Sequence, residues 1–202
     1  MSTAYDTAPR LALISALLGT AERGLHPGAG SSLSTRHHDG MLITPAVPPT
    51  NGMTADDIAF VHNDGTADGK RLPANDWRVH AALLQARPDL HTIVRLRTPA
   101  ATALASLRRP LPVVHHLVET LAGGEIACGR FAPNGTSALA SNTVAAMKDR
   151  NACLQANNAL VVGADTPAEA VQLGLQIELL CDQYLRACAV GEPFVLAPNE
   201  LN

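Results

Sequence analysis

The sequence predicts a single α/β domain with a central, mostly antiparallel sheet covered by helices. Segments with helical apolar stripes alternate along the chain with short apolar segments typical of strands. The strands lie close together in sequence, and hairpin turn signals such as Asn63–Gly65 join them. No repeat, low-complexity tract or linker divides the 202 residues, a length that suits one domain. We therefore expect residues 1–202 to form one domain.

Composition excludes several classes of protein. The net charge is -3 and aromatic residues make up 3% of the chain, which is unlike the basic, aromatic surface of a nucleic-acid-binding protein. No apolar run is long enough to cross a membrane, and the N-terminus lacks the pattern of a signal peptide. The four cysteines include no CxxC pair. This favours reduced thiols and a cytoplasmic protein that binds neither nucleic acid nor membrane.

Proline and glycine residues mark the ends of the predicted N-terminal elements. Pro9–Arg23 is predicted as a helix because proline suits a first helical turn, Gly24 suits a C-cap, and an apolar stripe lies between them. A small-residue loop over residues 26–36 follows. Met41–Thr44 is predicted as a short strand that Pro45 ends.

The middle of the chain alternates in the same way. After a turn over residues 48–52, Thr54–Asp57 is predicted as one helical turn and Ile58–Val61 as a strand. Asn75 or Asp76 can cap a helix over residues 77–86, and Pro88 terminates it.

The second half contains three further helices and three further strands. Thr166–Glu169 forms a capping box with proline at the first helical position, and it opens a long helix that Gly191 and Pro193 end. The remaining predicted elements are a strand within His91–Thr98, a helix over Pro99–Leu107, a strand over Glu125–Cys128, a helix over Thr136–Lys148 and a buried strand over Ala159–Val162.

Arg95 and Arg97 are the most unusual residues of these elements. They alternate with Val94 and Leu96 in a strand pattern, so both guanidiniums project from the same face. Two adjacent positive charges require an anionic ligand or a compensating carboxylate. The first interpretation is a clamp for a carboxylate or phosphate, and the second is a structural salt bridge with Asp76.

Nine segments of the chain match one known family in order and spacing: residues 24–25, 28–36, 39–45, 70–80, 87–89, 112–115, 122–124, 135–136 and 160–163. Together they cover roughly residues 24–193 with almost no gaps. Through these segments the chain resembles the class II aldolase/adducin family. The resemblance implies the fold of that family, a homotetramer with active sites between subunits, and a zinc-dependent retro-aldol cleavage of phosphorylated sugars.

The same resemblance shows where this chain departs from the family. The two histidines of the family's His-x-His motif and its third histidine correspond to Arg95, Arg97 and Asn158. A protonated guanidinium has no free lone pair, and an amide is a poor zinc ligand. We therefore expect no metal and no other cofactor. A relocated metal site that uses His80, His115 or His116 stays open, without support from spacing.

The family's phosphate-binding and proton-transfer residues also differ here. The loop over residues 28–34 lacks the family's threonine and asparagine, and Thr44-Pro45 is not followed by the family's glycine. A Ser-Ser-Glu motif reads Ala74-Asn75-Asp76, and a tyrosine that donates a proton corresponds to His116. We predict catalytic roles for Asp76, His116, Arg95 and Arg97, and substrate binding by Asn158, Ser31, Ser32, Thr44 and Asn75.

Two functions follow from these residues. The first is a metal-independent lyase, isomerase, dehydratase or cyclase that acts on a small anionic carbonyl or carboxylate compound. The second is a non-catalytic pseudo-aldolase that binds a ligand or serves as an oligomeric scaffold. In the second case Asp76 is a helix cap paired with arginine, His116 is an exposed loop residue, Asn158 fills the metal cavity, and the serines form a passive turn.

Overall fold

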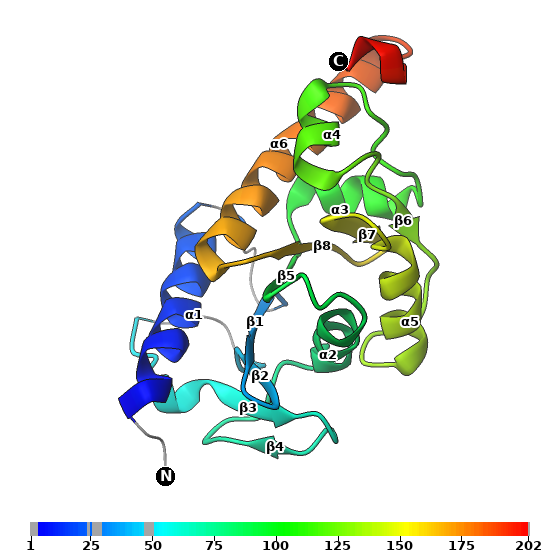
Figure 1. Ribbon diagram of the computed structural model, residues 1–202. Helices are drawn as coiled ribbons and strands as arrows, with labels where there is room; N and C mark the ends of the chain where they lie inside the picture. The colour runs from blue at the N-terminus through cyan, green and yellow to red at the C-terminus, as the bar shows by residue number, and fades with distance from the viewer. Residues whose placement is uncertain (1–3, 24, 26–29, 47–50, 202) are drawn as a thin grey trace.

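A computed structural model describes residues 4–23, 25, 30–46 and 51–201. One eight-stranded sheet has the order β4-β3-β2-β1-β5-β8-β7-β6, and Figure 1 shows helices on both of its faces. Only the β6–β7 pair is parallel. The strands are β1 Ser32–His37, β2 Gly40–Ile43, β3 Ala59–His62, β4 Ala67–Asp68, β5 Thr92–Leu96, β6 Cys128–Gly129, β7 Ala152–Gln155 and β8 Ala159–Ala164. The predicted mostly antiparallel α/β fold is confirmed.

The helices divide between two apolar layers. The α-helices are α1 Ala4–Glu22, α2 Trp77–Ala86, α3 Pro99–Ser106, α4 His116–Ala122, α5 Ser137–Ala146 and α6 Pro167–Val190, with 3-10 turns at Ala55–Asp57 and Pro198–Glu200. Buried side chains of α1, α3, α4 and α6 pack with one face of the sheet, whereas those of α2 and α5 pack with the other face. No helix in the described part of the chain is long and apolar enough to cross a membrane.

Alternation along β5 decides where the two arginines lie. Val94 and Leu96 belong to the layer of α1, α3 and α6, while Ile93 belongs to the layer of α2 and α5. Arg95 alternates with Val94 and Leu96, so it shares the face of Ile93 and points toward α2 and α5. It is 1% exposed and is the largest fully buried side chain among the described residues.

A glycine lets the long C-terminal helix lie close to the same strand. Gly174 is buried in α6, and a Cβ built on it would lie 2.5 Å from Cδ1 of Leu96. The capping box at Thr166 and Glu169 that opens α6 is confirmed.

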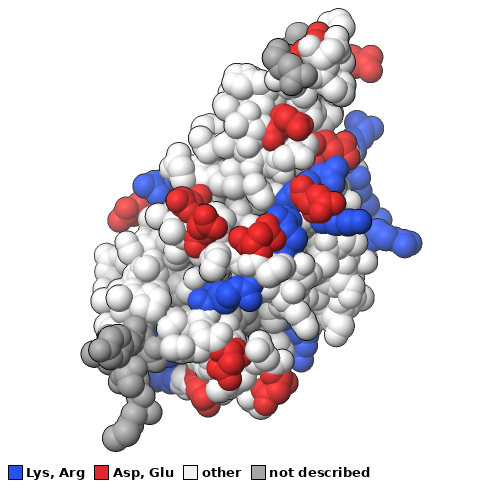
Figure 2. Space-filling model, in the orientation of Figure 1, with Lys and Arg blue, Asp and Glu red and all other residues white. Residues whose placement is uncertain are grey.

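Figure 2 shows acidic and basic side chains interspersed over the face that it draws, so that face carries no broad field of one sign.

Several sequence predictions are corrected. Helix α1 begins at Ala4, so Pro9 lies inside it rather than at its first turn. Part of the predicted loop over residues 26–36 is strand β1, because Ser32–His37 pairs with β2 and β5 on its two sides. Strand β7 is an element that the sequence does not predict. The expected strand over Glu125–Cys128 is replaced by the shorter β6. Gly24 and residues 26–29 and 48–50 lie outside the described residues.

Candidate functional site

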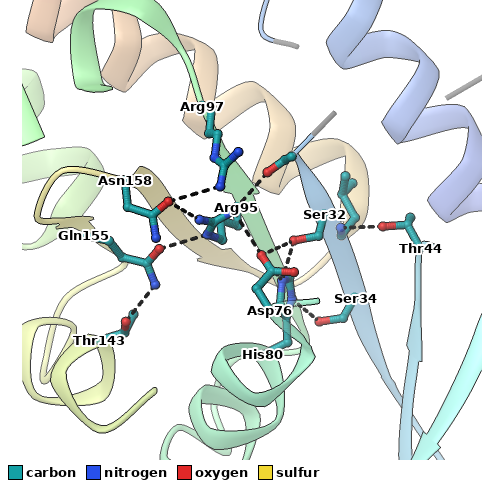
Figure 3. A network of polar contacts seen from close by, with 12 residues as sticks. Ser32, Ser34, Thr44, Asp76, His80, Arg95, Arg97, Thr143, Gln155 and Asn158 are labelled. Atoms are coloured by element: carbon teal, nitrogen blue, oxygen red, sulfur yellow. Dashed lines mark hydrogen bonds and ion pairs between the residues drawn. The ribbon is translucent and has the colours of Figure 1, made fainter. Parts of the chain in front are cut away.

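A cavity of about 180 Å³ opens where the start of β1, the segment after β2, the start of α2 and the end of β5 meet. Figure 3 shows the polar side chains that converge beside it. The cavity is lined by Gly30, Ser31, Ser32, Pro45, Ala46, Ala74, Asn75, Asp76, Arg95, Arg97 and Asn134.

The Arg95 guanidinium is held almost entirely by the protein. Its Nε donates to Gln155 Oε1 at 2.9 Å, its Nη1 to the carbonyl of Gly30 at 2.9 Å, and its Nη2 to Asn158 Oδ1 at 2.5 Å. Nη1 also lies 3.2 Å from Asp76 Oδ2. A guanidinium has five N–H donors, and these contacts engage four of them. Arg95 therefore has at most one N–H group left for a ligand.

Arg97 is held much more loosely. Its Nη2 donates to Asn158 Oδ1 at 3.3 Å, and within the described chain this is its only hydrogen bond. The side chain is partly exposed and lines the cavity beside Gly30. Asn158 Oδ1 therefore joins the two arginines, but only Arg97 keeps most of its donors available to a bound molecule.

Asp76 is the acidic group of the site and is 4% exposed. Burial favours the neutral carboxyl, but His80 and Arg95 and the hydrogen bond from Ser32 outweigh it and hold the pKa of Asp76 well below its usual range. The Ser32 hydroxyl donates to Oδ2 at 2.7 Å. The His80 Nε2 atom is 3.8 Å from Oδ2, too far for a direct hydrogen bond, but it lies 2.8 Å from the Ser32 hydroxyl that contacts the same oxygen.

A second set of buried residues supports this pair. Gln155 accepts from Arg95 and donates through Nε2 to Thr143 Oγ1 at 2.8 Å. Thr143 in turn donates to the carbonyl of Leu139 at 2.7 Å. Burial lowers the pKa of Arg95, while the nearby Asp76 carboxylate opposes that shift. Each polar group that surrounds Arg95 thus has a partner of its own.

The structure brings most of the predicted site residues together. Ser31, Ser32, Asn75, Asp76, Arg95 and Arg97 line one cavity, and Asn158 bonds both arginines. Asp76 is the N-cap residue of α2, but its side chain makes no capping hydrogen bond and instead meets Ser32 and Arg95.

Two predicted residues lie outside this arrangement. Thr44 is fully buried, and its hydroxyl accepts from the backbone N–H of Leu33 at 3.0 Å. It does not line the cavity. His116 is exposed at the start of α4, not in a loop, and its ring stacks on that of His115 with centroids 4.4 Å apart. It likewise does not line the cavity of its own chain.

Sequence reasoning missed Thr143, Gln155 and Asn134 as members of the site, and it considered His80 only as a ligand of a relocated metal. His80 carried a usable signal, because it lies four residues after Asp76 and the two therefore share one helix face. The partners of Gln155 and Thr143 are distant in sequence, and nothing local marks either residue.

The residues at Arg95, Arg97 and Asn158 do not fit a zinc ion. Guanidiniums offer donors only, and the Asn158 oxygen already accepts from both of them. Across residues 4–23, 25, 30–46 and 51–201, no group of three or more His, Cys, Asp and Glu side chains is placed to hold a metal ion. The guanidiniums offer only N–H donors, which suit an anion better than a metal cation.

Comparisons with known proteins agree on the family. A family model described as the Class II Aldolase and Adducin N-terminal domain matches residues 11–185. A 5-methylthioribulose-1-phosphate/5-deoxyribulose-1-phosphate aldolase from Rhodospirillum rubrum is 36% identical over 196 residues, which cover 95% of this chain and 89% of the relative. An L-fuculose phosphate aldolase from Escherichia coli is 31% identical over 188 residues, 93% and 87% of the two chains.

A solved structure of an L-fuculose 1-phosphate aldolase has the same architecture. It superposes with a TM-score of 0.92 at 31% identity, and the match covers 100% of this chain and 94% of that one. The match to the family model, these two relatives and the shared architecture establish that the chain belongs to the class II aldolase and adducin family.

Proposed function

We propose that this protein is an aldolase-related enzyme that acts without a metal on a small anionic carbonyl compound, as a lyase, isomerase, dehydratase or cyclase. The observation that carries the proposal is the open guanidinium of Arg97, which lines the same cavity as the Asp76 carboxylate. An anion-binding group and a proton-transfer group thus meet at one small site.

Charge pairing makes Arg97 the anion-binding group. The Arg95 charge is compensated by Asp76 at 3.2 Å, whereas Arg97 has no ion pair within the described part of the chain. The other polar residues that line the cavity are neutral: Ser31, Ser32, Asn75 and Asn134. The described lining therefore carries one net positive charge, which favours a ligand with a carboxylate or phosphate group.

The two arginines have different tasks in this proposal. Arg97 holds the anionic group or a developing oxyanion, because its guanidinium keeps donors that the described residues do not engage. Arg95 keeps Asp76 ionised. Because the pKa of Asp76 lies well below its usual range, the carboxylate is a weak base and accepts a proton only from a position that Arg97 has already made acidic.

The relatives support an anionic substrate. Their names say that they act on L-fuculose phosphate and on 5-deoxyribulose 1-phosphate, each of which combines a sugar with a phosphate group. We therefore propose a small substrate that keeps one anionic group and one carbonyl.

Ligand binding without turnover is the second candidate function, and the buried Arg95–Asp76 pair favours it. A carboxylate that compensates a buried arginine is needed for stability whether or not it transfers protons. An open cavity remains beside the pair, so both candidates predict anion binding. Only the first predicts that substitutions at Asp76 abolish a reaction.

We also propose that His116 serves the cavity of a neighbouring copy in a homotetramer. Its exposure at the start of α4 and its absence from the cavity of its own chain support this placement. Mixing an Asp76→Asn variant with a His116→Ala variant tests it. Restored turnover in mixed oligomers of two inactive parents is expected, and parents that remain inactive together contradict it.

The first experiment is a binding screen with a matched control. L-Fuculose 1-phosphate, 5-deoxyribulose 1-phosphate, pyruvate and uncharged L-fuculose are titrated while the melting temperature is followed. We expect at least one anion to raise the melting temperature of the wild type and to lose that effect in Arg97→Gln. Arg186→Gln is the control, because Arg186 is an exposed residue of α6 paired with Asp182. An unchanged response in Arg97→Gln contradicts the proposal.

Metal independence has its own test. The protein is treated with a chelator, its zinc content is measured by mass spectrometry, and anion binding and turnover are measured again. We expect both to persist in the metal-free protein. Loss of both, with recovery on adding zinc, contradicts the metal-independent assignment while leaving the family assignment intact.

A further inference from the structure

We propose that His80 is a positioning residue for Asp76. Through the Ser32 hydroxyl it fixes which carboxylate oxygen the protein holds, and so leaves the other oxygen to the cavity. Only the use made of that free oxygen rests on the proposed function. The positioning itself is a property of four side chains: Ser32, Ser34, Asp76 and His80.

The imidazole of His80 is completely enclosed. It lies in the first half of α2, is 0% exposed and touches two serines of strand β1. Its Nε2 is 2.8 Å from Ser32 Oγ, and its Nδ1 is 2.8 Å from Ser34 Oγ. The two serines share a face of β1 because they are two residues apart. One ring therefore bridges two hydroxyls, as Figure 3 shows.

Counting protons assigns the ring nitrogens. Asp76 pairs with the Arg95 guanidinium at 3.2 Å, and a carboxylate in such a pair can only accept, so the Ser32 hydroxyl donates its single proton to Oδ2, 2.7 Å away. Ser32 Oγ can then only accept from His80, and the hydrogen bond at 2.8 Å requires a proton on Nε2. The order of donation is His80 to Ser32 to Asp76.

This order leaves one oxygen of Asp76 unused. Every contact of the carboxylate with the described residues involves Oδ2, which meets Ser32 Oγ, Arg95 Nη1 and His80 Nε2. Asp76 nevertheless lines the cavity. Oδ1 is thus the oxygen available to a bound molecule, and the relay from His80 prevents the Ser32 proton from turning away from Oδ2.

Strand register explains why these groups meet. Ser32 lies directly opposite Arg95 in the β1–β5 pair, and cross-strand neighbours project from the same face. His80 lies one helical turn after Asp76. The carboxylate is therefore held between a strand pair that supplies Arg95 and Ser32 and a helix turn that supplies His80.

The first test reads the ring nitrogens directly. Protein labelled with ¹⁵N-histidine is observed by long-range ¹H–¹⁵N correlation, and the His80 signals are assigned by their loss in His80→Gln. We expect a protonated Nε2. An unprotonated Nε2 overturns the proposal, and the measurement needs no ligand, so it is independent of whether Arg97 binds an anion.

The second test separates positioning from packing and from charge. Gln can place a donor near Nε2, whereas Asn reaches only the Nδ1 position, so His80→Gln keeps the donor to Ser32 and His80→Asn removes it. The carboxyl carbon of ¹³C-labelled Asp76 is titrated in each variant and assigned with Asp76→Asn. Among the described residues, Arg95 and His80 are the charged or titratable groups nearest Asp76, and Arg97 lines the same cavity.

Positioning predicts different results for the two variants. We expect Asp76 to titrate at a higher pH in His80→Asn, which lacks the donor to Ser32, than in His80→Gln, which keeps it, by about one pH unit. Equal titrations in both variants overturn the proposal, because His80 then acts by charge or packing. Circular dichroism checks that both variants are folded.

Discussion

Nη1 of Arg95 lies 3.2 Å from Oδ2 of Asp76, and the two side chains are only 1% and 5% exposed. Two opposite charges that are both removed from water depend on each other, because either one alone would be buried without compensation. The paired side chains both line the cavity. Arg97 lines it too, but within the described part of the chain its positive charge has no ion-pair partner. The stability of the site therefore depends on Arg95, whereas the proposed binding of anions depends on Arg97.

Removing Asp76 should destabilise the protein strongly. In Asp76→Ala the Arg95 charge stays buried without its partner, and we expect a loss of roughly 3–5 kcal/mol in the free energy of unfolding by urea. Asp182→Ala is the matched control, because it removes an exposed partner of Arg186 on α6 and should cost less than about 1 kcal/mol. Equal losses in the two variants would show that the buried pair is not coupled.

The contribution of Asp76 to the free energy of unfolding should also depend on pH. Its pKa in the folded protein is lower than that of an unfolded aspartate, roughly 3.9. The ionised Asp76 therefore stabilises the folded protein fully at pH values above the unfolded pKa, above about pH 4–5. This stabilisation is lost as the pH falls toward the lower pKa of the folded protein. The difference in urea stability between wild type and Asp76→Asn should shrink between pH 7 and pH 3. A difference that stays constant over this range would contradict the assignment.

The sequence predicts the fold well where elements carry strong local signals. The capping box at Thr166 and the apolar run Ala159–Val162 both identify real elements. Strand β1 is predicted as a loop because its sequence, Ser-Leu-Ser-Thr-Arg-His, is polar and rich in small residues. The two serines can occupy the buried face of β1 because both form hydrogen bonds with His80. That partner lies 46 to 48 residues away in the sequence, so no local pattern reveals the strand.

The site is predictable only in part for the same reason. Arg95 and Arg97 are conspicuous because they interrupt an apolar strand, and the pairing of Arg95 with Asp76 is one of two interpretations open from the sequence. The structure adds that Arg95 is both paired and fully buried, whereas Arg97 is not. Strand alternation suggests one common face for them, but it cannot say which of two neighbouring guanidiniums has its donors already engaged.

Gly30 should be required for the position of Arg97. A Cβ on Gly30 would lie 2.6 Å from Nη1 of Arg97, and its φ of +134° is one that other residues rarely adopt. We expect Gly30→Ala to cost roughly 1–3 kcal/mol of stability and to weaken anion binding as Arg97 is displaced. Gly52→Ala is the control, since a Cβ added to Gly52 would have no other atom within 4 Å. Thermal unfolding and the anion titration measure both effects, and an unaltered titration in Gly30→Ala would contradict the contact.

Three substitutions should create a metal site at the two arginines and Asn158. Asn158 Oδ1 lies 2.5 Å and 3.3 Å from Nη2 of Arg95 and Arg97, so these three side chains converge on one point. Imidazoles there supply the neutral nitrogen ligands that zinc prefers. We expect Arg95→His/Arg97→His/Asn158→His to bind close to one zinc ion per chain after dialysis, by mass spectrometry, and the wild type to bind far less. The double variant that keeps Asn158 is the matched control, because two imidazoles and an amide hold zinc more weakly than three imidazoles. Equal zinc in the wild type and the triple variant would mean that the native metal ligands lie elsewhere in the chain.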